Sequence, residues 1–195
     1  MRTRVAGVLL AAGEGSRFGR PKALVELNGQ TLAERGVGLL RAGGADPILV
    51  VTGAATVELG GTYTVYNPAW RSGMGSSLRA ALQVLIDTST DVGAVVVALA
   101  DQPLVGAEAV ARLIAAYRDG APVAVAAYDG QARNPVLLAR EHWAEVIATA
   151  TGDQGARTFL RARPDVVTLV ECGDTGRPDD IDTPEDLARI TAVRD

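Results

Sequence analysis

Lys22 closes a glycine-rich segment, residues 10–22, and it is the one lysine among the 19 lysine and arginine residues of the chain. An ammonium group is a compact point charge on a flexible stem, whereas a guanidinium is a broad planar fork. A site crowded with phosphate oxygens and a metal ion can require the smaller group. The position of this lysine therefore indicates a binding site for a polyphosphate, although chance alone could also place a single lysine here.

The segment before Lys22 has the features of a phosphate-binding loop. It follows an apolar run, residues 5–10, and its glycines have the spacing G-x-G-x-x-x-G, which matches neither the dinucleotide fingerprint nor the Walker A loop. Glycines let backbone N–H groups approach phosphate oxygens closely. Arg17 and Lys22 lie within the segment and would balance the charge of a triphosphate. The alternative is a plain turn between a strand and a helix.

Asp101 comes directly after the most apolar run of the chain, residues 94–100. A carboxylate at the carboxyl end of a strand suits magnesium, an ion that favours one or two carboxylates together with phosphates and water. The sequence therefore predicts that Asp101 is a metal ligand. The alternative is that Asp101 caps the helix that follows.

Three further carboxylates, those of Asp179, Asp180 and Asp182, lie within four residues of one another, just before Thr183-Pro184. Carboxylates this close repel one another unless a cation or a basic group lies between them. We expect Asp180 or Asp182 to be a second metal ligand. Asp182 could equally be only the cap of the last helix.

The segment from Asn67 to Leu78 combines glycines on both sides of Met74 with two serines that begin a helix. Exposed N–H groups and hydroxyls at a helix N-terminus form a site for an anion or a ribose. The alternative is a loop with a serine cap, in which Trp70 packs under the loop instead of stacking on a ligand. Residues 152–157 and Arg133-Asn134 are further candidates for substrate-facing loops, or else a capped helix and a strand entry.

Apolar runs that alternate with helical patterns indicate an α/β fold. Strands are expected at residues 5–10, 47–51, 63–66, 94–100, 123–126, 135–138 and 166–171, and helices at 31–41, 75–86, 107–117, 141–148, 154–161 and 183–193. This alternation predicts a mostly parallel sheet with helices on both faces. The chain shows no linker or repeat, so residues 1–195 are expected to form a single domain. Ligands bind beyond the carboxyl ends of such strands, where Thr52-Gly53, Asn67-Pro68 and Asp101-Gln102 should join the glycine-rich segment.

The composition argues against several other kinds of protein. The net charge of −4 and the pI of about 5.1 argue against general nucleic-acid binding, which uses a basic face. The single cysteine, Cys172, excludes an internal disulfide and a thiolate-rich zinc site. The single histidine, His142, has no partner imidazole. No stretch approaches the roughly 20 apolar residues that span a bilayer, and the first apolar run is too short for a signal peptide. We therefore expect a cytoplasmic protein with no nucleic-acid or membrane partner.

Together, these motifs resemble the MobA-like nucleotidyltransferase family, and the resemblance extends from residue 5 to about residue 187. It is carried by Leu10-Ala11-Ala12-Gly13-x-Gly-Ser-Arg17-Phe-Gly19-x-Pro-Lys22, Gly73-Met74-Gly75-Ser76-Ser77, Leu99-Ala100-Asp101-Gln102-Pro103, Gly152-Asp153-Gln154-Gly155-Ala156-Arg157 and Asp180-Ile181-Asp182-Thr183-Pro184. Ala12 stands where guanylyltransferases of the family typically have glycine, so the chain is more similar to the molybdenum cofactor cytidylyltransferase branch. Phe18 departs from that branch, which usually has methionine there. The resemblance implies a three-layer α/β/α, Rossmann-like nucleotidyltransferase fold.

The resemblance implies a Mg²⁺-dependent transfer of a nucleoside monophosphate, CMP from CTP, to the terminal phosphate of molybdopterin, with release of pyrophosphate. It implies a recipient molybdoenzyme or its chaperone as a further partner. Other bases and acceptors stay open, among them GTP with molybdopterin, a sugar 1-phosphate, an isoprenoid precursor and phospholactate. A protein that binds the molybdenum cofactor and delivers it without turnover is the alternative outside enzymes.

The resemblance also implies roles for the candidate residues. Arg17, Lys22 and Asp101 would be catalytic, and Asp101 with Asp180 or Asp182 would hold the magnesium ion. The nucleotide would be bound by Leu10, Ala11, Ala12, Gly13, Gly15, Ser16, Arg17, Lys22, Thr52, Gly53, Asn67, Ser76, Ser77 and Asp101. The second substrate would be bound by Gly73, Met74, Gly75, Gln102, Arg133, Asn134 and Arg157.

Overall fold

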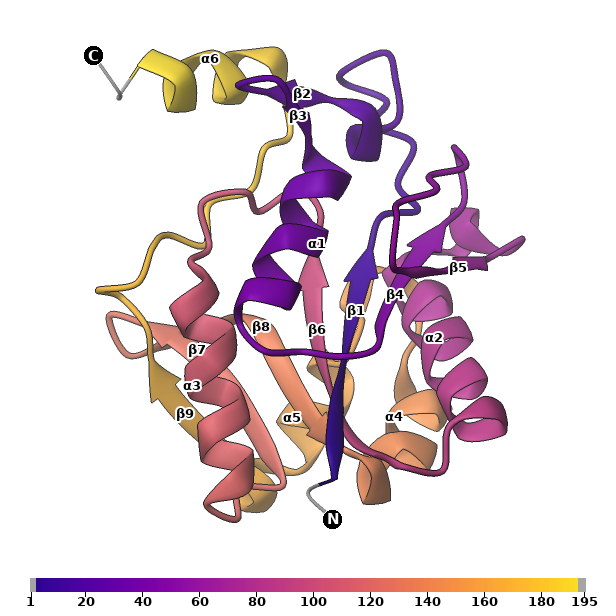
Figure 1. Ribbon diagram of the computed structural model, residues 1–195, viewed down its shortest axis with the longest axis vertical. Coiled ribbons are helices and arrows are strands. Elements are labelled where there is room, and N and C mark those ends of the chain that lie inside the picture. Colours follow the sequence, from indigo (N-terminus) through magenta and orange to yellow (C-terminus); the bar gives the residue numbers. More distant parts are fainter. Residues whose placement is uncertain (1–2, 193–195) are drawn as a thin grey trace.

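A seven-stranded sheet forms the centre of the computed structural model, which describes residues 3–192 (Figure 1). The strands lie in the order β5-β4-β1-β6-β8-β7-β9. Their bounds are β1 (Arg4–Leu10), β4 (Ile48–Thr52), β5 (Tyr63–Tyr66), β6 (Val92–Leu99), β7 (Val123–Tyr128), β8 (Gln131–Ala139) and β9 (Val167–Glu171). The mostly parallel sheet predicted from the sequence is confirmed, because β5, β4, β1 and β6 are mutually parallel and β9 is parallel to β7.

Helices cover both faces of this sheet, which confirms the three-layer α/β/α architecture (Figure 1). They are α1 (Leu32–Ala42), α2 (Met74–Thr88), α3 (Ala107–Arg118), α4 (Trp143–Thr149), α5 (Arg157–Ala162) and α6 (Pro184–Ala192). Neighbouring residues of a strand point to opposite faces. Leu9 of β1 therefore packs with α1 and α3, whereas Val8 packs with α2, α4 and α5. Because β1 and β6 are covered on both faces, their sequences are continuous apolar runs.

Strand β8 departs from the parallel arrangement, because it is antiparallel to both β6 and β7. It follows β7 with no helix between them, so the alternation of strands and helices is also interrupted here. Strands β7 and β8 form a hairpin whose turn is Asp129-Gly130, and both turn residues have positive φ, 52° and 74°. Asp-Gly is a sequence typical of tight hairpin turns. The long strand β8 contains Arg133 and Asn134, so these residues are part of the sheet and not of a loop.

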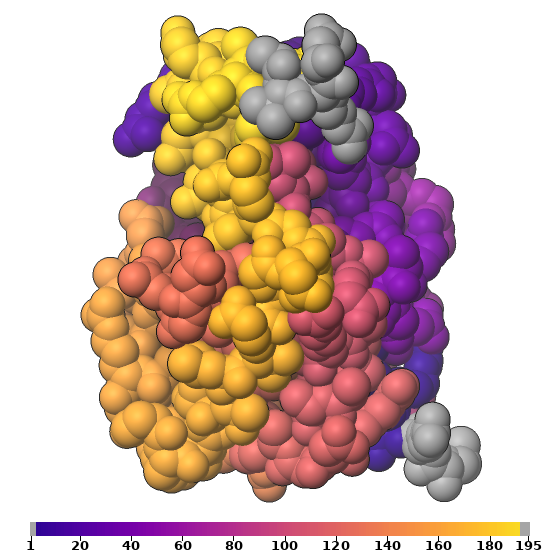
Figure 2. Space-filling view, turned by 90° about the vertical axis from the view of Figure 1, so that its left-hand side faces the viewer, coloured from indigo at the N-terminus to yellow at the C-terminus, as the bar shows by residue number. Residues whose placement is uncertain are grey.

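A third apolar cluster lies above the carboxyl ends of the strands (Figure 1). The short strand β2 (Glu26–Leu27), which pairs with β3 (Gln30–Thr31), contributes Leu27 to it, and the start of α1 contributes Leu32. Helix α6 and the segment before it provide further contacts. Ile181 is fully buried there against Val25 and Leu32. The C-terminal segment reaches this position by running over the surface from β9 to α6 (Figure 2). The cluster therefore brings residues 180–183 next to the glycine-rich segment.

Gly36 and Gly38 of α1 provide a matched test of the helix packing. A Cβ at Gly36 would lie 2.4 Å from Leu9 Cδ1, whereas a Cβ at Gly38 would have no heavy atom of another element within 4 Å. Glycine in a helix interior costs roughly 0.5–1 kcal/mol relative to alanine. We expect Gly38→Ala to raise the free energy of unfolding by about this amount, and Gly36→Ala to lower it by about 1 kcal/mol or more through overpacking. Urea denaturation measures both, and equal effects would contradict the packing described.

Candidate active site

A cavity of about 620 Å³ opens at the carboxyl ends of β1 and β6, at the edge where the sequence predicted the ligand site. The glycine-rich segment after β1 forms one part of its lining, and the segment that leads from β5 into α2 forms another. Of the site residues predicted from the sequence, the lining includes Leu10, Ala11, Ala12, Gly13, Gly15, Ser16, Lys22, Gly73, Met74, Ser77 and Asp101.

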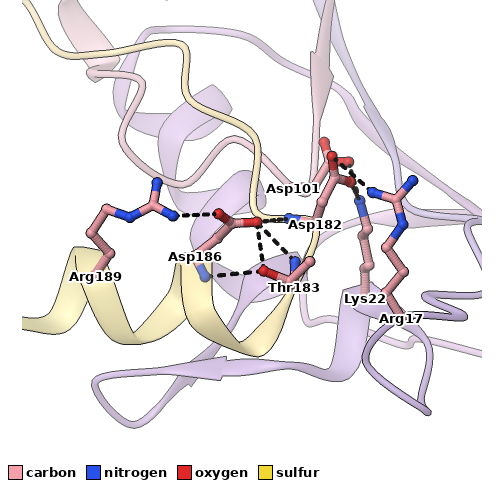
Figure 3. A network of polar contacts seen from close by, with 7 residues as sticks. All are labelled: Arg17, Lys22, Asp101, Asp182, Thr183, Asp186 and Arg189. Atoms are coloured by element: carbon pink, nitrogen blue, oxygen red, sulfur yellow. Dashed lines mark hydrogen bonds and ion pairs between the residues drawn. The ribbon is translucent and has the colours of Figure 1, made fainter.

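The Lys22 ammonium lies between two carboxylates from distant parts of the chain (Figure 3). Its Nζ is 2.9 Å from Asp101 Oδ2 and 2.5 Å from Asp182 Oδ1, across sequence separations of 79 and 160 residues. Arg17 approaches the same cluster, with Nη1 3.7 Å from Asp182 Oδ2. Burial of the ammonium acts to lower the pKa of Lys22, but the charge of Asp101 and hydrogen bonds to both carboxylates outweigh burial and raise that pKa. The amine is therefore protonated at neutral pH.

The three aspartates before α6 have three different surroundings. Asp179 pairs with Arg177, at 3.1 Å from Oδ2 to Nε, and it is about half exposed. Asp180 Oδ1 accepts a hydrogen bond of 2.8 Å from Gln102 Nε2. Asp182 faces Lys22. The arrangement therefore separates Asp179 from the acidic cluster and leaves Asp180 and Asp182 near Asp101.

Burial raises the pKa of Asp180, and the charges of Asp101 and Asp182 add to this effect. Gln102, which is 6% exposed, holds the Asp180 carboxyl and also donates to the carbonyl of Pro178. The backbone N–H of Ile181 donates to the Asp101 carbonyl at 2.8 Å. These hydrogen bonds fix the position of the C-terminal segment relative to the end of β6.

Neither Asp101 nor Asp182 is a helix cap. Helix α3 begins at Ala107, with Gly106 as its N-cap residue. At the start of α6, the Asp186 carboxylate accepts hydrogen bonds from the backbone N–H groups of Asp182 and Thr183 and from the Thr183 hydroxyl (Figure 3). The Asp186 N–H donates to the Thr183 hydroxyl in return. Thr183 and Asp186 thus form the cap, which leaves the Asp182 side chain available to Lys22.

This cap predicts a dependence of stability on pH. The hydrogen bond from the Thr183 hydroxyl, followed by that from the Asp182 N–H, holds the pKa of Asp186 below its ordinary value. The stabilising effect of the ionised carboxylate is fully present above the unfolded pKa of about 3.9, and it is lost as the pH falls through the lower, folded value. We expect Asp186→Asn to lower the midpoint of urea unfolding at pH 7 but to match the parent protein in strong acid. Glu185→Gln, in the same helical turn, is the control, and an equal loss for both variants would contradict the cap.

The residues fit a divalent cation that is shared with a phosphate. Within residues 3–192, no group of three or more His, Cys, Asp or Glu side chains is arranged to ligate a metal ion. Asp101 and Asp182, however, direct carboxylate oxygens at one ammonium, so two carboxylates converge on one cation position. Mg²⁺ typically takes one or two protein carboxylates and fills its other positions with phosphate oxygens and water. Asp101 and Asp182 could therefore hold a metal ion once the amine moves to a phosphate.

The segment from Asn67 to Ser77 is held by its own hydrogen bonds. Asn67 Nδ2 donates to the hydroxyls of Ser76 and Ser77, at 2.8 and 3.0 Å. The Ser76 hydroxyl also donates toward the carbonyls of Ala69 and Gly73. Ser77 lines the cavity, whereas Asn67 and Ser76 are buried behind it. The structure therefore gives Asn67 and Ser76 a positioning role for this segment.

The remaining predicted residues lie outside the main cavity. Thr52 is buried, and a Cβ at Gly53 would collide with Trp70. Asn134 and Arg157 line a smaller neighbouring cavity of about 40 Å³, which shares Leu10, Met74 and Leu99 with the main one. Gly75, Gln102 and Arg133 also lie outside both cavities. Gly75 packs against Ala150 and Thr151, Gln102 binds the C-terminal segment, and Arg133 donates to Ala132 and Gln131.

The sequence analysis did not single out several residues of the cavity lining. Arg71 and Asp153 both line it, as does Glu14 of the glycine-rich segment. Asp153 comes from the Gly-Asp-Gln-Gly turn, whose backbone packs so closely on Gly73 that a Cβ there would lie 2.4 Å from Gly152 C. Asp153 Oδ1 accepts a 3.4 Å hydrogen bond from the backbone N–H of Met74, which is the first residue of α2. Asp153 could have been predicted from its position inside the motif of residues 152–157. For Arg71, the only indication in the sequence was its neighbour Trp70.

This fold, with a glycine-rich loop after the first strand and a carboxylate at the end of β6, is that of the nucleotidyltransferases. A structure titled as the Rv0371c homologue from Mycobacterium sp. strain JC1 superposes with a TM-score of 0.83, at 31% identity over 99% of this chain and 98% of that one. The chain belongs to the family described as the MobA-like NTP transferase domain, whose model matches residues 7–167. The family predicted from the sequence is thereby confirmed.

Other proteins similar to this chain have names that refer to different activities. A protein of Paenarthrobacter nicotinovorans named nicotine blue oxidoreductase is 38% identical over 95% of this chain and 96% of its own length. A probable molybdenum cofactor guanylyltransferase of Opitutus terrae is 51% identical, but over only 24% of this chain and 23% of its own. Rv0371c of Mycobacterium tuberculosis H37Rv, solved in complex with manganese, is 26% identical, with a TM-score of 0.77 over 97% of this chain and 99% of that one. Over residues 3–192, no helix combines the length and apolar character needed to span a membrane.

Proposed function

We propose that this protein transfers CMP from CTP to the terminal phosphate of molybdopterin, with Mg²⁺ as the divalent cation, and releases pyrophosphate. The observation that carries the proposal is the convergence of Lys22, Asp101 and Asp182 beside the glycine-rich loop. A triphosphate needs cations and a metal-binding carboxylate at one place, and this cavity offers both. Residues 1–195 act in this proposal as one nucleotidyltransferase domain in the cytoplasm, where both substrates would be available.

Support for the finer assignments comes from separate observations. The similarity to a protein named for molybdenum cofactor guanylyl transfer supports the acceptor. Ala12, which lines the cavity, supports cytosine over guanine. The manganese complex of Rv0371c supports a divalent cation. A recipient molybdoenzyme or its chaperone would then accept the product.

The proposed reaction is a displacement at phosphorus. An oxygen of the acceptor phosphate forms a bond to the α-phosphorus, and the bond from that phosphorus to the bridging oxygen of the β-phosphate breaks, so pyrophosphate leaves with the bonding electrons. Lys22 and Arg17 neutralise the charge that develops on the leaving group. Backbone groups of residues 10–13 orient the nucleotide, and Asp101 with Asp182 would hold Mg²⁺, which supplies further charge neutralisation at the phosphates.

Pyrophosphate release tests the proposal directly. The protein is mixed with Mg²⁺, one of the four nucleoside triphosphates and one acceptor, and the products are identified by mass spectrometry. We expect pyrophosphate and a cytosine dinucleotide only with CTP and molybdopterin. Release with a sugar 1-phosphate, an isoprenoid precursor or phospholactate would correct the acceptor. Binding of molybdopterin without pyrophosphate release from any triphosphate would favour a delivery chaperone.

The name of the Paenarthrobacter relative raises oxidation and reduction of nicotine blue as a second candidate function. The glycine spacing after β1 differs from the fingerprint that binds a dinucleotide such as NAD(P)H. The cluster of Lys22, Arg17 and carboxylates suits a polyphosphate better than hydride transfer. Incubation with nicotine blue and NADH or NADPH, followed by absorbance, should show no consumption of either compound. Consumption at a rate above that of pyrophosphate release would favour the oxidoreductase.

A further inference from the structure

Arg71 and Trp70, with the guanidinium over the indole, form a shelf in the lining of the main cavity. We infer that this shelf stacks against the base of the bound nucleoside triphosphate. The inference rests on the proposed function, because it takes a nucleotide as the ligand of the cavity. It adds the position of the base and the group that binds it.

The Arg71 guanidinium is already oriented before any ligand binds. Its Cζ lies 4.3 Å from the centroid of the Trp70 ring, which places the guanidinium over the indole. Lys22 and Arg17, the other cations at this site, are both paired with carboxylates. Arg71 makes no ion pair or side-chain hydrogen bond with any of residues 3–192, and it is exposed. Its outer face and its N–H groups are therefore available to a ligand.

The indole beneath Arg71 is held in place by its surroundings. A Cβ at Gly53 would lie 2.5 Å from Trp70 Cβ, so the absence of a side chain at Gly53 lets the indole pack against the end of β4. The backbone N–H of Trp70 donates to the Asn67 carbonyl, and the Trp70 carbonyl accepts from the backbone N–H of Gly73, so the backbone that carries the indole is also held. A stacking surface that is ordered in advance loses less conformational entropy when a ligand binds.

The order of the strands indicates which part of the ligand reaches the shelf. Lys22 and Asp101, which would bind the phosphates and the metal ion, lie at the ends of β1 and β6. The shelf follows β5, which lies on the other side of β1 from β6. The small cavity with Asn134 and Arg157 lies on the β6–β8 side instead. A triphosphate bound at Lys22 would therefore extend its base toward the shelf, and the acceptor would approach from the side of β8.

Stacking on this shelf would supply affinity for any base. An arginine plane stacks on aromatic rings, and every nucleobase offers a flat π face. The loss of such a contact should weaken binding about tenfold. Discrimination between bases would come from hydrogen bonds made by residues 10–13.

Calorimetry with two probes tests the shelf. CTP and tripolyphosphate, which has no base, are titrated with Mg²⁺ into the parent protein, Arg71→Met, Arg71→Lys and Arg79→Met. We expect Arg71→Met to weaken CTP binding about tenfold and to leave tripolyphosphate binding within about twofold of the parent protein. Arg71→Lys should resemble Arg71→Met, because lysine keeps the charge but has no plane. Arg79, an exposed residue of α2, gives the same charge change away from the cavity lining and should behave as the parent.

The outcomes separate this inference from the proposed function. Equal weakening of CTP and tripolyphosphate in Arg71→Met would place Arg71 on the phosphates and overturn the shelf. Unchanged CTP binding, or a rise only in the KM for the acceptor, would overturn the shelf and leave the proposed function standing. Failure of the parent protein to bind any nucleoside triphosphate would overturn both.

Fluorescence provides a second readout, because the chain has two tryptophans and Trp143 is fully buried. We expect CTP to quench the emission of the parent protein, and Trp70→Phe to lose this quenching. Tripolyphosphate should have no such effect. Quenching that persists in Trp70→Phe would contradict a base at the shelf.

Discussion

Replacing Lys22 with methionine should lower the single-turnover rate of nucleotidyl transfer by about 100-fold or more, a loss of about 3 kcal/mol of transition-state stabilisation. The raised pKa of Lys22 keeps the amine charged, and its position between Asp101 and Asp182 places it at the cavity where the phosphates would bind. A charged group that is oriented in advance stabilises the developing charge of pyrophosphate without reorganisation. Methionine retains the apolar stem and removes only this charge. Quenched-flow measurements of dinucleotide formation would give the rate.

Two controls separate catalysis from folding in this experiment. Lys22→Arg keeps the charge, but its planar fork cannot occupy one point between two carboxylates as an ammonium does, so we expect an intermediate rate. Lys22→Met should also unfold at a lower temperature than the parent, since Asp101 and Asp182 then face each other without their shared cation, and Mg²⁺ should recover part of this loss. Equal single-turnover rates for Lys22→Met and the parent would remove Lys22 from the mechanism.

Much of the fold could be predicted from the sequence because its elements have strong local patterns. Strands β1 and β6 are covered on both faces and are therefore continuous apolar runs, which are easy to recognise. In a parallel sheet their carboxyl ends lie at one edge, so Lys22 and Asp101 were expected to be close although they are 79 residues apart. The position of the cavity follows from the same two facts.

Other features depend on contacts that leave no local pattern. The dipeptide Asp129-Gly130 is typical of a hairpin turn and could have predicted the antiparallel strand β8. The apolar run around residue 136, however, fits a parallel strand equally well. The choice among Asp179, Asp180 and Asp182 was open because the segment that carries them has no regular period. In the structure the three carboxylates face different groups: Asp179 pairs with Arg177 two residues before it, whereas Asp180 and Asp182 face the distant residues Gln102 and Lys22. The hydroxyl of Ser76 looked available for a ligand until its partners from residues 67–73 were known.

Replacing Asp101 with asparagine should have the largest effect of all, a decrease of about 1,000-fold in turnover, or about 4 kcal/mol. Asp101 follows the central strand β6, its carbonyl accepts the Ile181 N–H, and its side chain is 26% exposed, against 45% for Asp182. The more constrained carboxylate should position a metal ion more strictly, so Asp182→Asn should cost less, about 10- to 100-fold.

Both variants should also need more Mg²⁺ for half-maximal activity, because asparagine offers a neutral oxygen in place of a charged one. Binding of Mn²⁺ in the presence of CTP, followed by electron paramagnetic resonance, measures this without turnover and should weaken in the same order. The double variant should be little worse than Asp101→Asn alone, since two ligands of one ion act as a unit. If the two losses multiplied instead, Asp182 would act through Lys22 and not through the metal ion, and the ion would depend on Asp101 and the phosphates alone.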